Sequence, residues 1–191
     1  DACDTTLGAG VIQPAGKFAS NEVCAIAGGK RYIVEGEPNI PATFGCVARV
    51  GTAGDGAEKP MDALVAALSD ALVGPGGCNE GFLRDDAILV VTFISDDASY
   101  EDTGTPQDWY DAIVAAKNGD PEAVVVIGVT PSWPGCNEEM MAKVRGTHWA
   151  EFLTLWPHSA HGSVCDLDYS GLFLGAIAEI DSACDTFVPP I

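Results

Sequence analysis

Acidic and hydroxyl side chains occur together at the end of a predicted strand and in a glycine-rich loop. Asp96 and Asp97 directly follow the apolar run 87–94, and Thr52 and Glu58 lie in a loop that precedes a helix. Carboxylate and hydroxyl oxygens suit hard divalent cations. We therefore predict a cation site with Asp96 as its lead ligand, Thr52 and Glu58 as further donors, and Asp97 orienting the loop or facing solvent. Alternatively, Asp96 is a turn carboxylate that accepts backbone N–H bonds.

Signatures of the common hydrolases are absent, since neither G-x-S-x-G nor H-E-x-x-H occurs. The glycine-rich stretch 51–56 lacks the Gly-Lys-Ser/Thr ending of a phosphate-binding loop. A zinc site is disfavoured, because one of the three histidines falls in a predicted helix and the other two in a loop; they are His148, His158 and His161. We expect a non-enzymatic domain. The alternative is a metal-dependent hydrolase in which Asp96 and Glu58 bind the metal and a histidine is the general base.

The elements that must position these residues alternate between strand and helix. Apolar runs rich in β-branched residues predict buried strands at 87–94 and 123–129, with a short third strand at 162–165. Predicted helices start at Pro60, follow the N-cap Thr105, run over 137–155 with a break at Gly146, and follow the cap Asp168. This order predicts a doubly wound α/β fold with a mostly parallel, Rossmann-like sheet, whose ligands bind at the carboxyl ends of the strands.

The first part of the chain carries scattered glycines and prolines. We interpret residues 1–41 as an irregular excursion or hairpin with a strand-like stretch at 30–34, stapled by disulfides. Residues 42–191 form the α/β domain, so the chain is one structural domain overall.

Charge and hydropathy exclude two classes of partner. Twenty-eight acidic residues against nine lysines and arginines give a formal net charge of −19. Such a chain repels nucleic acid and anionic lipid. Its apolar runs are shorter than the roughly 20 residues of a membrane helix, so we predict no membrane insertion.

Seven cysteines are widely spaced and include no C-x-x-C pair. This pattern favours disulfides and hence an extracellular, periplasmic or outer-surface location, with buried thiols in a cytosolic protein as the alternative. Cys136 and Cys165 follow neighbouring strands at one sheet edge, which predicts a bridge between them. The remaining expected pairs are Cys3 with Cys24 and Cys46 with Cys78. Cys184 is left over, on a helix face that we expect to be buried together with Phe173, Ile177 and Ile180.

Four segments together resemble a von Willebrand factor A-type domain of the cysteine-bearing variety found in bacterial secreted or surface proteins: 50–64, 78–87, 93–97 and 162–169. The resemblance covers residues 42–186. It implies a Rossmann-like fold and a metal-ion-dependent adhesion site, where Mg²⁺, Mn²⁺ or Ca²⁺ completes its coordination with a carboxylate of a protein partner.

In that family the adhesion site has three parts. Asp96 matches the aspartate after the fourth strand, and the threonine part corresponds to Thr52 by residue type or to Glu58 by spacing. The Asp-x-Ser-x-Ser turn and the strand before it have no counterpart. We therefore predict that a companion polypeptide or a cleaved N-terminal segment supplies a parallel strand beside 87–94. Cys184 is the candidate for a bridge to this polypeptide.

Without that strand, side chains such as Val90, Thr92 and Ile94 would be exposed. The resemblance implies an extracytoplasmic, non-enzymatic protein-binding or adhesion domain that uses a divalent cation near Asp96. The alternative is a metal-free structural assembly module.

Overall fold

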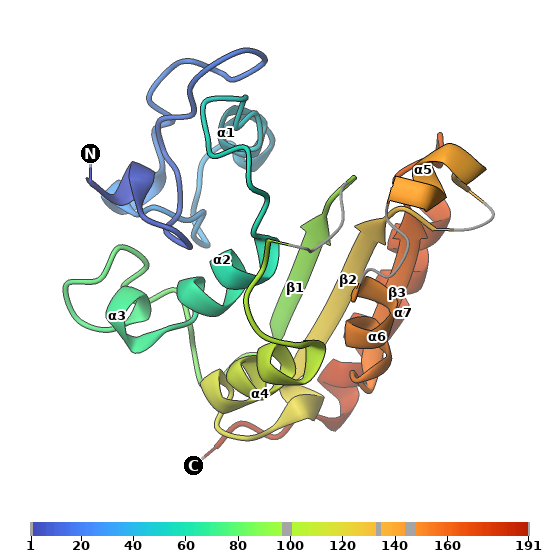
Figure 1. The fold of residues 1–191 in the computed structure, drawn as a ribbon. Coiled ribbons are helices and arrows are strands. Elements are labelled where there is room, and N and C mark those ends of the chain that lie inside the picture. The colour runs from blue at the N-terminus through green and yellow to red at the C-terminus, as the bar shows by residue number, and fades with distance from the viewer. Residues whose placement is uncertain (1, 97–100, 133–134, 144–147, 191) are drawn as a thin grey trace. The chain divides into compact units, whose positions relative to one another are not determined.

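A computed structural model describes residues 2–96, 101–132, 135–143 and 148–190 (Figure 1). The chain divides into two compact units. Unit 1 comprises Asp1–Ala57 and Asp62–Leu83, and unit 2 comprises Glu58–Met61 and Arg84–Ile191. The boundary that we expected between residues 41 and 42 falls inside unit 1.

Unit 1 is built from short helices and loops. Its helices are η1 (Ala2–Thr5), η2 (Ala27–Gly29), α1 (Ile40–Val47), α3 (Asp70–Val73) and most of α2 (Pro60–Ala67). The expected strand at 30–34 is wrong, because the described residues of unit 1 contain no strand. Arg31 instead forms an ion pair with Asp4, and its Nε donates to the Gly10 carbonyl at 2.7 Å. These contacts hold the segment against the N-terminal loop rather than in a ladder.

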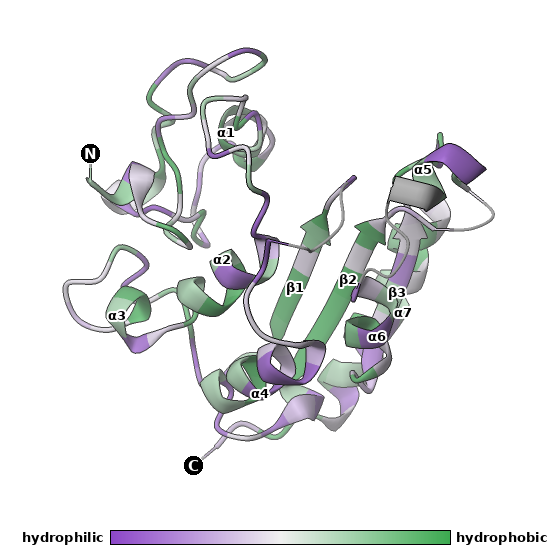
Figure 2. Ribbon diagram, in the orientation of Figure 1, coloured by the Kyte–Doolittle hydropathy of each residue, from purple (hydrophilic) through white to green (hydrophobic). Residues whose placement is uncertain are grey.

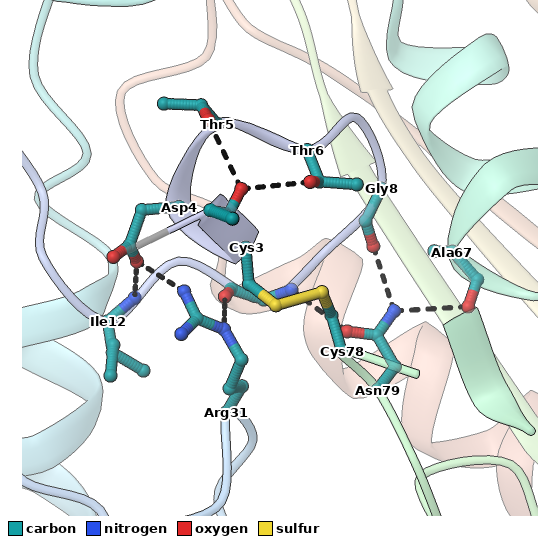
Figure 3. The surroundings of a disulfide bond; sticks show 12 residues. Cys3, Asp4, Thr5, Thr6, Gly8, Ile12, Arg31, Ala67, Cys78 and Asn79 are labelled. Carbon is teal, nitrogen blue, oxygen red and sulfur yellow. Dashed lines mark hydrogen bonds and ion pairs between the residues drawn. A yellow bond between two sulfur atoms is a disulfide. The ribbon is translucent and has the colours of Figure 1, made fainter. Parts of the chain in front are cut away.

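Two disulfides cross-link unit 1, with partners other than those we expected. Cys3 pairs with Cys78 and Cys24 pairs with Cys46, at Cα separations of 5.8 and 5.7 Å. The amide of Asn79 explains the first pair: it accepts from the Gly10 N–H and donates to the carbonyls of Gly8 and Ala67 (Figure 3). The N-terminal loop therefore lies against residues 78–79, and this long-range contact brings Cys3 to Cys78.

The centre of unit 2 is an open sheet of three parallel strands, β1 (Leu89–Ile94), β2 (Val124–Thr130) and β3 (His158–Ser163), in the order β1-β2-β3. The strands expected at 87–94 and 123–129 are confirmed to within two residues. The expected burial is confirmed for β2 and wrong for β1, in which buried and exposed residues alternate because α7 packs on β2 and β3 and leaves one face of β1 uncovered. The strand expected at 162–165 lies earlier, where it pairs Val125 with His158 and Thr130 with Ser163. Its sequence, His-Ser-Ala-His-Gly-Ser, lacks an apolar run because β3 is an edge strand.

Helices cover both faces of this sheet, which makes unit 2 a mixed α/β structure (Figures 1 and 2). On one face α4 (Pro106–Ala116) and α6 (Trp149–Thr154) pack together, and Phe93 of β1 contacts Trp149 and Phe152. On the other face α7 (Ser170–Thr186) packs on β2 and β3. Two short helices complete the unit, η3 (Pro121–Ala123) and α5 (Glu138–Lys143).

The buried face of α7 differs from the one that we expected. Ala176 and Ala183 face the sheet and pack on Val125 and Ile127. Phe173, Ile177 and Cys184 are exposed, so their predicted burial is wrong. Small residues let the helix approach the valine- and isoleucine-rich face of β2 closely. The helix carries two apolar stripes, and periodicity alone does not select between them.

Lys117 fastens the end of α4 to the chain that enters β1. Its buried Nζ donates to the carbonyls of Arg84 and Ala87, both at 2.7 Å. Burial lowers the pKa of Lys117, although Asp85 and Asp86 oppose this shift. The amine thus satisfies two carbonyls at a point where the chain changes direction.

Gly128 of β2 provides a first test of this core. A Cβ there would lie 2.8 Å from Leu153 Cδ1 and 2.9 Å from Phe93 Cζ. We expect Gly128→Ala to lower the free energy of unfolding by about 1–3 kcal/mol through overpacking. The matched control is Gly175→Ala in α7, where a Cβ meets nothing within 4 Å. This control should raise stability by about 0.5–1 kcal/mol, because alanine favours helix. Denaturant unfolding measures both, and equal effects would contradict the packing.

The two disulfides of unit 1 should contribute unequally to stability. Cys3 and Cys78 are 75 residues apart in sequence, whereas Cys24 and Cys46 are 22 apart. In the chain-entropy description the longer loop stabilises by about 4 kcal/mol and the shorter by about 3 kcal/mol. We expect the double variant Cys3→Ser/Cys78→Ser to melt below Cys24→Ser/Cys46→Ser in calorimetry. The reverse order would show that local packing outweighs loop closure.

Candidate functional site

The carboxyl end of β1 carries the residues that the sequence singled out. Ser95 follows the strand, is buried, and donates its backbone N–H to the Val129 carbonyl at 3.1 Å. Its hydroxyl donates to Glu58 Oε2 at 3.4 Å. Asp96 comes next and is exposed. Unit 2 therefore brings the Glu58 carboxylate to the strand end at which Asp96 stands, although the two residues are far apart in sequence.

The structure does not test the other two predicted ligands. Thr52 is exposed in a loop of unit 1, whereas Asp96 and Glu58 belong to unit 2. Asp97 lies outside the described residues. The participation of all four residues in a cation site stays a prediction.

A third carboxylate, which sequence reasoning missed, fixes the loop after the site. Asp102 Oδ1 accepts a hydrogen bond from the backbone N–H of Met61 at 3.0 Å, three residues after Glu58. The Trp109 indole Nε1 donates to the Thr103 carbonyl at 2.7 Å. These contacts tie the segment between β1 and α4 to the start of α2. The available sequence signal for this contact was the position of Asp102, an acidic residue between the end of a predicted strand and a capped helix.

A row of buried hydroxyls crosses the carboxyl edge of the sheet, one from each strand end. They belong to Ser95, Thr130 and Ser163. Thr130 Oγ1 is 2.9 Å from His161 Nε2, and Ser163 Oγ accepts from the Cys165 N–H at 3.2 Å. The sequence signal for this row is a hydroxyl residue at the end of each strand or directly after it.

Each of the three histidines has a partner within unit 2, and His161 has its partner in the row of hydroxyls. His158 lies between Glu122 and Glu179, at N···O distances of 3.2 and 3.6 Å. His148 lies 3.7 Å from Glu151. His161 contacts Thr130, and burial lowers the pKa of His161.

The predicted bridge between Cys136 and Cys165 is confirmed, with a Cα separation of 5.1 Å.

Few of the described side chains at the carboxyl end of β1 could bind a metal ion. Within the described ranges, no group of three or more His, Cys, Asp or Glu side chains could hold a metal ion. The donors at the end of β1 are the carboxylates of Asp96 and Glu58 and the Ser95 hydroxyl. These oxygen donors fit a hard cation such as Ca²⁺ or Mg²⁺, which fills its remaining positions with water or with a ligand's oxygen.

Comparison with protein-family models, with curated proteins and with solved structures gives no match to this chain. A search of the described helices for one long and apolar enough to cross a membrane finds none.

The loop that follows the site ends in a capping box whose stability should depend on pH. Asp108 Oδ2 accepts from the hydroxyl and the backbone N–H of Thr105 at 2.7 and 2.8 Å, and these bonds lower the Asp108 pKa. The carboxylate form is thus favoured in the folded state. Its stabilisation is present above the ordinary carboxyl pKa of about 3.9 and is lost as pH falls through the lowered value.

We therefore expect Asp108→Asn to lower the melting temperature at neutral pH and the difference from the native chain to shrink below about pH 4. Thermal unfolding measured from pH 7 to pH 2.5 tests this expectation. A difference that stays constant over this range would contradict the role of the charge.

Proposed function

We propose that this chain is an extracytoplasmic, non-enzymatic protein-binding domain that holds a divalent cation at the carboxyl end of β1. Asp96 and Glu58 bind the ion, and an acidic group of a protein partner completes its coordination. The resemblance to von Willebrand factor A-type domains supports this proposal, as does the arrangement of a parallel sheet with helices on both faces. A finer assignment to that doubly wound, von Willebrand A-like fold belongs to the same proposal.

The observation that carries the proposal is the hydrogen bond between Ser95 and Glu58. It places a second carboxylate at the strand end that already carries Asp96. In the proposed site, a divalent cation offsets the negative charge of the two carboxylates. The exposure of Asp96 leaves the ion open to a carboxylate from outside the chain.

A binding role accounts for the site better than hydrolysis does. A metal-dependent hydrolase needs a general base within reach of the metal-bound water. The three histidines contact Glu151, the pair Glu122 and Glu179, and Thr130. His148 and His158 thus form ion pairs on other parts of unit 2. His161 contacts the sheet edge that carries Ser95, where its Nε2 is engaged with the Thr130 hydroxyl.

The second candidate function is a metal-free structural assembly module. The small donor set at Asp96 favours it, and so does the open edge of the β1 strand. In this role the chain binds another polypeptide through the sheet alone. The two candidates differ in whether a cation changes the stability of the chain.

The three intramolecular disulfides support an extracytoplasmic location for either candidate. Such bonds persist in oxidising compartments and are rare in the cytosol.

A cation-dependent melting shift tests the proposal. At a Ca²⁺ concentration of about 100 times Kd, binding to the folded state adds about 2.7 kcal/mol, or about 5–10 °C in melting temperature. We expect Asp96→Ala to abolish this increment and Glu58→Ala to weaken it. Mg²⁺ and Mn²⁺ are measured in parallel by differential scanning fluorimetry.

The matched control is Asp166→Ala, which removes an exposed carboxylate beyond the end of β3. This variant should keep the full cation-dependent increment in melting temperature. Such a result would show that the loss of one negative charge does not by itself abolish the increment. An increment that survives Asp96→Ala would refute the assignment. If divalent cations do not raise the melting temperature of the native chain, the cation site is refuted and the metal-free assembly module is the function that remains.

A further inference from the structure

The strand β1 has an open edge. β1 pairs with β2 over six consecutive residues, from Leu89 with Val124 to Ile94 with Val129. Among the residues that the structure describes, β1 has no second strand neighbour. The backbone N–H and C=O groups on its outer side therefore form an unpaired row, which is a template for another strand.

One face of β1 is also uncovered. Leu89, Val91 and Phe93 are buried on the side of α4 and α6, whereas Val90, Thr92 and Ile94 are exposed. These three residues point to the same side of the sheet as Val125 and Ile127, which α7 covers. On that side of the sheet, the helix α7 therefore covers β2 but not β1. The exposed residues Val90, Thr92 and Ile94 form an uncovered strip along β1.

An apolar stripe is also exposed on α7. Leu172 covers Gly162, and Glu179 reaches His158, so that flank of α7 faces β3. At 100° per residue, Phe173 and Ile177 stand on the opposite flank, toward β2 and β1. Both are exposed apolar side chains. These exposed residues add apolar surface to the side of the sheet on which α7 packs.

We propose that the open edge of β1 binds an extended segment of another polypeptide, which adds to the sheet as a fourth strand. Its backbone pairs with β1, and apolar side chains at alternate positions lie beside Val90, Thr92 and Ile94. This binding mode names the type of partner and does not depend on the cation at Asp96.

Charge selects the kind of segment. The chain has 28 acidic and nine basic residues, and a second copy of it would double a net charge of −19. Association of two such chains through this edge is opposed by their mutual repulsion. A segment with lysine or arginine beside its apolar positions is attracted instead. The occupant is therefore a basic, apolar strand of a different chain.

A defined peptide tests this proposal on the full chain. The probe is a fluorescent nine-residue peptide in which valine and threonine alternate between two terminal lysines. A control peptide of equal charge carries proline at its centre and cannot extend the ladder. We expect the first peptide to bind at 0.15 M salt and the second to bind at least about tenfold more weakly. Hydrogen exchange should show new protection in residues 89–94.

Two lysine variants locate the binding surface. Ile94 and Leu174 are each 69% exposed, so neither substitution disturbs the core. Ile94→Lys places a charge on the edge strand and should weaken peptide binding by about tenfold, or about 1.4 kcal/mol. Leu174→Lys adds the same charge to α7, away from the edge, and should leave the affinity unchanged.

Several results would overturn the proposal. These are no binding of the valine-threonine peptide, equal binding of the proline peptide, or equal effects of the two lysine variants. Dimers of the chain that Ile94→Lys dissociates would assign the edge to a second copy. Full protection of the outward amides of β1 in the free chain would show that the chain covers its own edge.

Discussion

The burial of β2 is the constraint on which the rest of unit 2 depends. All seven of its residues are buried, so both faces and both hydrogen-bonding edges must be covered by other parts of the chain. β1 and β3 supply the edges in parallel, which requires a crossover helix before each return. α6 and α7 supply the faces. The carboxyl ends of the three strands consequently meet at one edge, and this is where Ser95, Thr130 and Ser163 gather.

Unit 1 is organised by a different kind of interaction. It has few buried apolar residues and no strand among the residues described, so disulfides and polar side chains take the place of a large core. Asn79 binds three backbone groups, and Arg31 binds Asp4 and the Gly10 carbonyl. Each of these contacts joins parts of the chain that are far apart in sequence, as the Cys3–Cys78 bridge does.

The two binding surfaces that we propose for unit 2 follow from the same sheet. The carboxyl end of β1 offers carboxylate and hydroxyl oxygens, while the side of β1 offers unpaired backbone and apolar side chains. The first suits an ion and an acidic group, and the second suits an extended apolar segment. A sheet that ends at β1 makes both accessible, because no further strand of the described chain lies beyond it.

The sequence by itself determined the elements with strong local signals. The apolar runs of β1 and β2 and the capping box of α4 appear where their residue types require them, because an apolar run rich in β-branched residues and a cap are local signals. Burial on both faces holds for β2 alone, since one face of β1 is exposed. The bridge of Cys136 to Cys165 followed from strand order, which constrains where two strand ends can lie. The exposure expected for Val90, Thr92 and Ile94 also agrees with the structure.

Tertiary structure alone decided the features that depend on distant partners. The polar strand β3 carries no apolar pattern and is a strand because β2 offers it an edge. The buried side of α7 was chosen by the fit of Ala176 and Ala183 to β2, and the pairing of Cys3 with Cys78 by the path of the N-terminal loop. The meeting of Glu58 with Ser95 is of the same kind, because a hydrogen bond across 37 positions is set by packing rather than by spacing.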